Sequence, residues 1–146
     1  MPTKQRTTTR KKKGDEVVIV SDLGRQQPQA TDFEEAVLGA CLIEKDAFPR
    51  VADILRPESF YDSKHRLIFE AIRFLAIENQ PVDILTVTEQ LKRNGDLDEV
   101  GGPYYIAELS QRVMSSAHIE YHAKIIAQKA LARDIISYSS RLLEEA

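Results

Sequence analysis

The sequence DSKHRLIFEAIRFLAIE, residues 62–78, contains the clearest helical pattern in this 146-residue chain. Its main apolar stripe consists of Leu67, Ile68, Ala71, Ile72 and Leu75. These residues recur with the three- and four-residue spacing of one helix face. Phe69 and Phe74 add a second apolar face. A helix that is apolar on most sides must be surrounded by other elements, so we expect residues 62–78 at the centre of the fold.

Upstream of this segment, capping and breaking residues predict two further helices. Thr31 and Glu34 have the spacing of a capping box, in which each side chain bonds the other residue's backbone amide. We therefore expect a helix over roughly 32–43. A second, short helix is expected over about 46–55, ended by Pro57.

Downstream, the same kind of signal predicts a fourth and a fifth helix. The fourth covers about 84–93, with Asp83 as its N-cap and Asn94-Gly95 as a left-handed stop. The fifth begins with Pro103 in its first turn and runs to about Gln111. No segment shows convincing strand alternation, so the expected fold class is all-α, a compact bundle of about six helices.

The sixth helix is expected from Ser116 to the end, because residues 116–146 contain neither Gly nor Pro. Leu131, Ile135, Tyr138 and Leu142 are spaced by four, three and four residues, which is the seam a partner helix requires. The sequence stops without a C-cap, so we expect a chain cut within or just after a helix whose partner lies downstream. The expected organisation is a leader over 1–30, a globular head over 31–115 and a long helix over 116–146.

The leader differs from the rest of the chain in charge. Residues 1–30 carry seven basic and three acidic side chains, a net of +4, whereas residues 31–146 carry 13 and 20, a net of −7. With one short apolar run, the leader is expected to be disordered. Arg10, Lys11, Lys12 and Lys13 could contact DNA phosphates. A solubilising leader is the favoured interpretation, because no aromatic residue is interleaved to stack on bases.

Composition and motifs exclude several classes of protein. No apolar run reaches the roughly 18 residues of a membrane helix, and no secretory signal follows the basic start. A single cysteine rules out a disulfide framework. The sequence lacks a G-x-x-x-x-G-K-[ST] loop, an H-E-x-x-H motif and a G-x-S-x-G motif. We expect a cytoplasmic scaffold with no catalytic, cofactor or metal site of its own.

A few single residues admit two interpretations each. His118 and His122 have a chelating i, i+4 spacing, but a polar pair near a helix start is favoured because the third histidine is distant. His65 is expected to be structural and to bond nearby backbone. Cys41 is expected to be a buried inert thiol rather than a nucleophile. Gly101-Gly102 is expected to be a turn rather than a phosphate cradle.

Four blocks in a fixed order carry a resemblance to a known family. They are Phe60-Tyr61 with His65–Ile72, Pro81–Val87 with Leu91, Gly95–Gly102 with Tyr105-Ile106 and Leu109, and His118–Ile126. Together they resemble the N-terminal domain of the bacterial replicative DNA helicase DnaB, over about residues 30–146. His118 is one departure, since the family usually has Asn there.

The resemblance implies an all-helical domain that ends in a helical hairpin, of which residues 116–146 would be the first helix. It implies self-association into dimers, and into hexamers built as trimers of dimers. It also implies a docking surface for the primase and possible contact with a helicase loader. ATP, Mg²⁺ and single-stranded DNA would bind a downstream RecA-like motor that this chain lacks.

The expected function is therefore the oligomerisation and primase-docking domain of a helicase that unwinds duplex DNA at the replication fork. The alternative is a stand-alone helical adaptor without a motor. A nucleic-acid-binding module using the basic leader is less favoured, because the body is acidic. An enzyme acting in its own right comes last.

Overall fold

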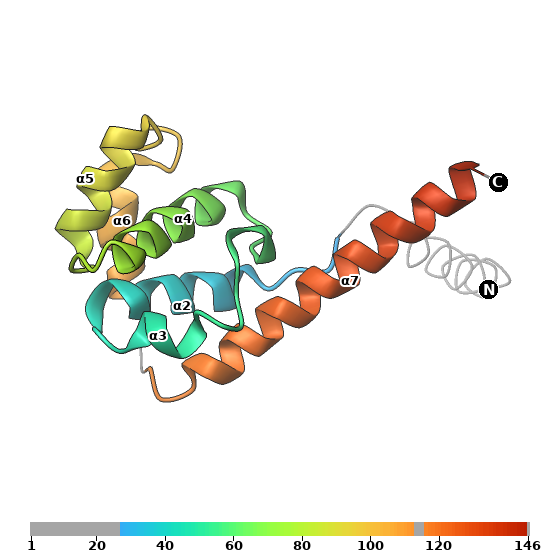
Figure 1. Ribbon diagram of the computed structural model, residues 1–146, viewed down its shortest axis with the longest axis horizontal. Coiled ribbons are helices and arrows are strands. Elements are labelled where there is room, and N and C mark those ends of the chain that lie inside the picture. The colour runs from blue at the N-terminus through green and yellow to red at the C-terminus, as the bar shows by residue number, and fades with distance from the viewer. Residues whose placement is uncertain (1–26, 113–115, 146) are drawn as a thin grey trace, which may run out of the picture.

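The computed structural model describes residues 27–112 and 116–145. These residues form six α-helices and one short 3₁₀ helix, with no strand among them. In order they are α2 (Thr31–Ile43), α3 (Ala47–Val51), η1 (Pro57–Ser59), α4 (Ser63–Ile77), α5 (Ile84–Asn94), α6 (Gly102–Gln111) and α7 (Ile119–Glu145). The prediction of an all-α fold is confirmed (Figure 1).

Helix α2 has more helical neighbours than α4, which corrects the expectation that residues 62–78 form the centre. It packs against α3, α4, α5, α6 and α7, whereas α4 packs against α2, α3, α5 and η1. Every residue from Val37 to Leu42 is buried. The small side chains of Gly39, Ala40 and Cys41 allow neighbours to approach α2 from several sides.

Helix α4 agrees with the predicted limits and with most of the predicted core. Asp62 caps it, since its Oδ1 accepts a 2.9 Å hydrogen bond from the amide of Lys64. In the apolar stripe predicted for residues 62–78, Leu67 is half-buried and the other four residues are buried. Phe69 is buried as well. The second apolar face is incomplete, because Phe74 is exposed.

The capping box predicted for Thr31 and Glu34 is wrong. The N-cap of α2 is Ala30, which makes no side-chain capping bond. Glu34 is buried and its carboxylate bonds another part of the chain instead. A buried backbone amide without an acceptor is costly. For Glu34, accepting from such an amide therefore outweighs the local capping bond at the start of α2.

The second helix is shorter than predicted. Helix α3 ends at Val51, and residues 52–55 leave it by turns that still bury Leu55. Pro57 does not simply end a helix, since it begins η1. A proline is accepted in the first turn, where its missing N–H is not needed.

The limits of α5 and α6 follow the predicted signals. The Asp83 carboxylate accepts from the Thr86 amide at 2.8 Å, and the Thr86 hydroxyl accepts from the Asp83 amide at 2.9 Å. Gly95 ends α5 with a φ of 77°. Gly101, with a φ of 104°, precedes α6 and confirms the predicted turn.

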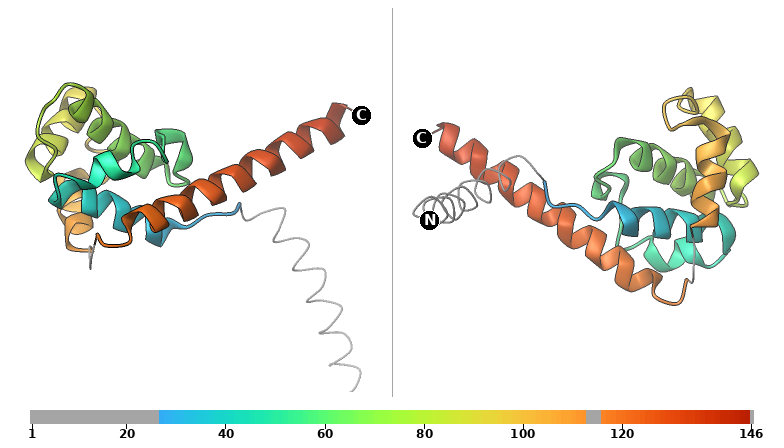
Figure 2. Two further views of the ribbon diagram at one scale, coloured as in Figure 1. Left: turned by 60° about the horizontal axis from the view of Figure 1, so that its bottom comes forward. Right: turned by 180° about the vertical axis from the view of Figure 1, so that it is seen from behind.

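Helix α7 consists of two halves with different surroundings. Its first half packs against α2, α3 and η1 and buries Ile119, Ala123 and Ile126. Its second half projects away from the other helices (Figures 1 and 2). The expected boundary at residue 116 lies just before α7, but the first half of this helix is part of the head's core.

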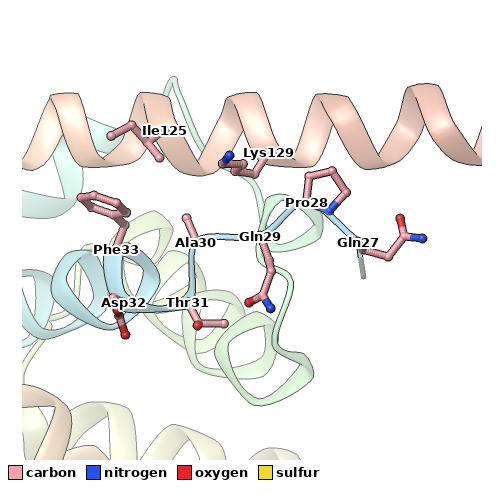
Figure 3. Close-up of a pocket in the computed structure, with 9 residues that line it drawn as sticks. All are labelled: Gln27, Pro28, Gln29, Ala30, Thr31, Asp32, Phe33, Ile125 and Lys129. Atoms are coloured by element: carbon pink, nitrogen blue, oxygen red, sulfur yellow. The ribbon is translucent and has the colours of Figure 1, made fainter. Parts of the chain in front are cut away.

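The leader expected over 1–30 is described only for residues 27–30, which are extended and lie along α7 (Figure 3). The basic cluster Arg10, Lys11, Lys12 and Lys13 lies outside the described residues. Among the helices that the structure describes, none is long and apolar enough to cross a bilayer.

Candidate helix-docking surface

The seam predicted on the last helix is an exposed apolar stripe. Leu131, Ile135, Tyr138 and Leu142 are 60%, 57%, 61% and 50% exposed, respectively. Ile135, Tyr138 and Leu142 lie on the projecting half of α7 and Leu131 lies just before it, and their spacing places all four on one face. We call these four residues the α7 stripe. Leu143, also exposed, extends the apolar surface on its flank.

The first half of α7 holds the stripe in place relative to the head. Its buried face is rotated by more than a quarter turn from the stripe, as the 3.6-residue period requires. Arg50 of α3 forms an ion pair with Glu120 at 3.3 Å. Further along, Arg133 donates hydrogen bonds to the carbonyls of Pro28, before α2, and of Ser59, at the end of η1. The stripe is thus displayed on a helix whose base is fixed and whose end has no neighbour within the described chain.

A groove between residues 27–33 and α7 lies near the base of this helix. Its volume is about 600 Å³. Phe33 and Ile125 face each other across it, whereas Asp32 points away from α7 (Figure 3). Lys129 lies above the extended segment. The groove is lined by apolar side chains such as Phe33 and Ile125 and by polar ones such as Gln29 and Lys129.

Sequence reasoning missed a buried polar chain that joins three helices. The carboxylate of Glu34 on α2 lies 2.8 Å from Nδ1 of His65 on α4. Nε2 of His65 lies 2.7 Å from the hydroxyl of Tyr105 on α6. Because a carboxylate only accepts, Nδ1 carries the proton, and in the neutral ring Nε2 accepts from the tyrosine hydroxyl.

Two members of this polar chain, Glu34 and His65, are too deeply buried to offer a surface to a substrate. Glu34 and His65 are each only 1% exposed. Burial raises the pKa of Tyr105 to about 12, and the nearby carboxylates of Glu35 and Asp62 act in the same direction. The expectation that His65 is structural agrees with this geometry, but its partners are side chains and not nearby backbone. A polar pair separated by 31 residues leaves no local signal in the sequence.

The two other histidines lie near the start of α7. The ring of His122 packs against Phe33 with centroids 5.0 Å apart, and His118 is exposed. Burial lowers the pKa of His122, and His118 contributes in the same direction. Within residues 27–112 and 116–145, no group of three His, Cys, Asp or Glu side chains could hold a metal ion.

Cys41 is buried, as predicted, and burial raises the pKa of its thiol to about 12. A thiol in that environment stays protonated near neutral pH and is a poor nucleophile.

Comparison with known proteins identifies the family. The family model described as "DnaB-like helicase N terminal domain" matches residues 26–128. The chain is 54% identical over 112 residues to the replicative DNA helicase DnaB of Rhodothermus marinus, covering 77% of this chain and 12% of that protein. It is 36% identical over 121 residues to the replicative DNA helicase DnaB of Geobacillus stearothermophilus, covering 83% and 27%, respectively. The chain therefore spans about an eighth to a quarter of these relatives.

Solved structures agree with the sequence comparison. The crystal structure of the N-terminal domain of DnaB helicase from Mycobacterium tuberculosis matches with a TM-score of 0.79 and 37% identity, covering 82% of this chain and 86% of that one. A DnaB-like replicative helicase, described with its interactions with primase, matches with a TM-score of 0.69 and 28% identity, covering 80% and 27%. With a family match over most of its length and the same all-α fold, this chain belongs to the DnaB-like helicase N-terminal domain family.

Proposed function

We propose that this chain is the oligomerisation and primase-docking domain of a replicative helicase. In that protein a downstream RecA-like motor would bind ATP, Mg²⁺ and single-stranded DNA and unwind the duplex. The observation that carries the proposal is the α7 stripe, an exposed apolar seam on a projecting helix. Exposure of an apolar seam to water is unfavourable, so the stripe favours a partner helix that would cover it.

The size of the stripe indicates how strongly it could bind. Fully burying one large apolar side chain contributes about 1.5–3 kcal/mol. The four stripe residues are already about half covered, so burying the rest yields roughly 3–6 kcal/mol per copy on the same scale. Two copies pairing symmetrically would gain roughly 6–12 kcal/mol, against an association cost of about 4–15 kcal/mol. Self-association of this chain should therefore be weak and should strengthen with a second hairpin helix.

The assembly proposed for the full helicase is a dimer that builds hexamers as trimers of dimers. A paired α7 would join two heads, and the remaining head surface would be available to the primase and to a helicase loader. The primase part is supported by the DnaB-like helicase described with its interactions with primase, to which this chain is similar.

The test of the stripe is Ile135→Asp, because a charge at its centre would lie in the proposed contact. The matched control is Ser140→Asp, which adds the same charge to an exposed position on the opposite side of α7. In sedimentation velocity over a concentration series, Ile135→Asp should weaken self-association at least tenfold, with helix content unchanged. Ser140→Asp should associate like the parent. Equal association of all three proteins would mean that the stripe is not the contact.

A second measurement separates the helicase domain from a stand-alone adaptor. An antibody raised to residues 31–146 should detect a protein several times heavier than 16.5 kDa in the source cell. Titration calorimetry with the purified primase of the same cell should then show binding. A native mass near 16.5 kDa, with no primase binding, would favour the adaptor.

A further inference from the structure

Arg133 lies where α7 leaves the head. The last fully buried residue of α7 is Ile126, and the residues after Ile136 are exposed. Among the described residues, Arg133 is the most C-terminal side chain of α7 that hydrogen-bonds another element.

The guanidinium of Arg133 bridges two separate parts of the chain. Nη1 donates to the carbonyl of Pro28 at 2.8 Å, in the extended segment that precedes α2. Nη2 donates to the carbonyl of Ser59 at 2.9 Å, at the end of η1. The Ser59 carbonyl lies at the end of η1, where the last carbonyls of a helix have no intrahelical partner, and the Pro28 carbonyl lies outside any helix. One planar group with fixed donor directions therefore ties α7 to two separate segments at once.

The loop under Arg133 is itself held by the buried polar chain. The guanidinium lies 5.5 Å from the centre of the Tyr61 ring, within range of a cation–π interaction. The Tyr61 amide donates to the buried Glu34 carboxylate at 2.7 Å. Burial lowers the pKa of Arg133, and the Glu34 carboxylate opposes that shift.

From these contacts we infer that Arg133 is a positioning residue that fixes the direction of the α7 stripe relative to the head. Its importance for docking rests on the proposed function. The 12 residues after Arg133, up to Glu145, span about 18 Å at 1.5 Å per residue. A 10° change in helix direction at Arg133 would move the far end by about 3 Å, more than half of one helical turn. Loss of the bridge should misplace the stripe without changing any residue in it.

The test measures the direction of α7 with spin labels at Glu70→Cys on α4 and Ser140→Cys on α7, both exposed positions. The buried Cys41 thiol stays unlabelled in the folded protein. The distance distribution is measured by double electron–electron resonance in the full chain, diluted with unlabelled protein. Arg133→Gln, which keeps a planar donor but not the fork, should widen the distribution at least twofold. Arg141→Gln, the control, removes an exposed arginine for which the structure gives no ion pair to a described residue and should change nothing.

Arg133→Lys provides an independent readout if Arg133→Gln loses helix content. It keeps the charge and should lose one of the two bonds, so an intermediate width is expected at an unchanged melting temperature. A distribution that matches the parent in a folded variant would overturn the inference, as would a lower melting temperature without widening.

The two proposals fail in different ways. If the proposed function is wrong, Ile135→Asp leaves association unchanged while Arg133→Gln still widens the distances. If Arg133 does not position the helix, the distances stay narrow while Ile135→Asp still weakens association. If both are right, Arg133→Gln weakens association at least threefold with the stripe intact.

Discussion

Replacing Glu34 by Ala tests whether the buried polar chain stabilises the head. The Glu34 carboxylate accepts from the Tyr61 amide at 2.7 Å, from Nδ1 of His65 at 2.8 Å and from the Asp62 amide at 3.3 Å. It is the point at which α2, α4 and the loop before α4 are joined. Truncation to Ala removes the acceptor and leaves these donors without a partner.

The expected loss in the free energy of unfolding follows from those donors. A buried donor without a partner costs about 1–3 kcal/mol, and the two short bonds dominate over the long one. The total should be about 3–5 kcal/mol, similar to removing one partner of a buried pair. A glutamate that only capped a helix would cost about 1 kcal/mol when removed. The two roles therefore differ by a measurable margin.

Urea unfolding followed by circular dichroism measures this difference at one fixed protein concentration. The control is Glu35→Ala, the adjacent residue, whose carboxylate forms an ion pair with Arg112 at 2.8 Å. An ion pair of this kind near the surface contributes about 0–1 kcal/mol, so the control should lose little. If Glu34→Ala lost less than about 1.5 kcal/mol, or no more than Glu35→Ala, the buried-acceptor reasoning would be refuted.

Three further predictions concern the core and the turns. Burial raises the pKa of Cys41 from 9.0 to about 12, so the folded state keeps a proton that the unfolded chain releases. The free energy of unfolding should fall as pH rises above 9, by up to about 1.4 kcal/mol per pH unit, and urea titrations of Cys41→Ala should show a shallower fall. Ile72→Asp should abolish cooperative melting, whereas Leu67→Asp, at a half-buried position, should only lower the melting temperature; equal effects would contradict the burial pattern. Gly101→Ala should destabilise more than Gly102→Ala in thermal melts, because its Cβ would lie 3.0 Å from Tyr105 Cβ while that of Gly102 meets nothing within 4 Å.

Much of the fold was predictable because its signals are local. The limits of α5 depend on Asp83 and on Gly95, whose backbone conformations and short-range bonds involve residues at most a few positions apart. The apolar spacing of residues 62–78 predicted α4 for the same reason. The α7 stripe was also visible, since a seam is a periodicity along one helix. That a partner helix covers this seam stays a prediction.

Other features depend on groups that are distant in sequence. Glu34 has the spacing of a capping residue, and only the packing of α2 against α4 presents it with His65 and the Tyr61 amide. The division of α7 into a buried and a projecting half likewise depends on where the head ends, which the uninterrupted helical pattern of residues 116–146 does not reveal. Arg133 resembles any surface arginine in the sequence, and the carbonyls of Pro28 and Ser59 lie 105 and 74 residues away. Helix limits follow from short-range bonding, whereas the partners of buried polar groups follow from which chain segments meet in the folded head.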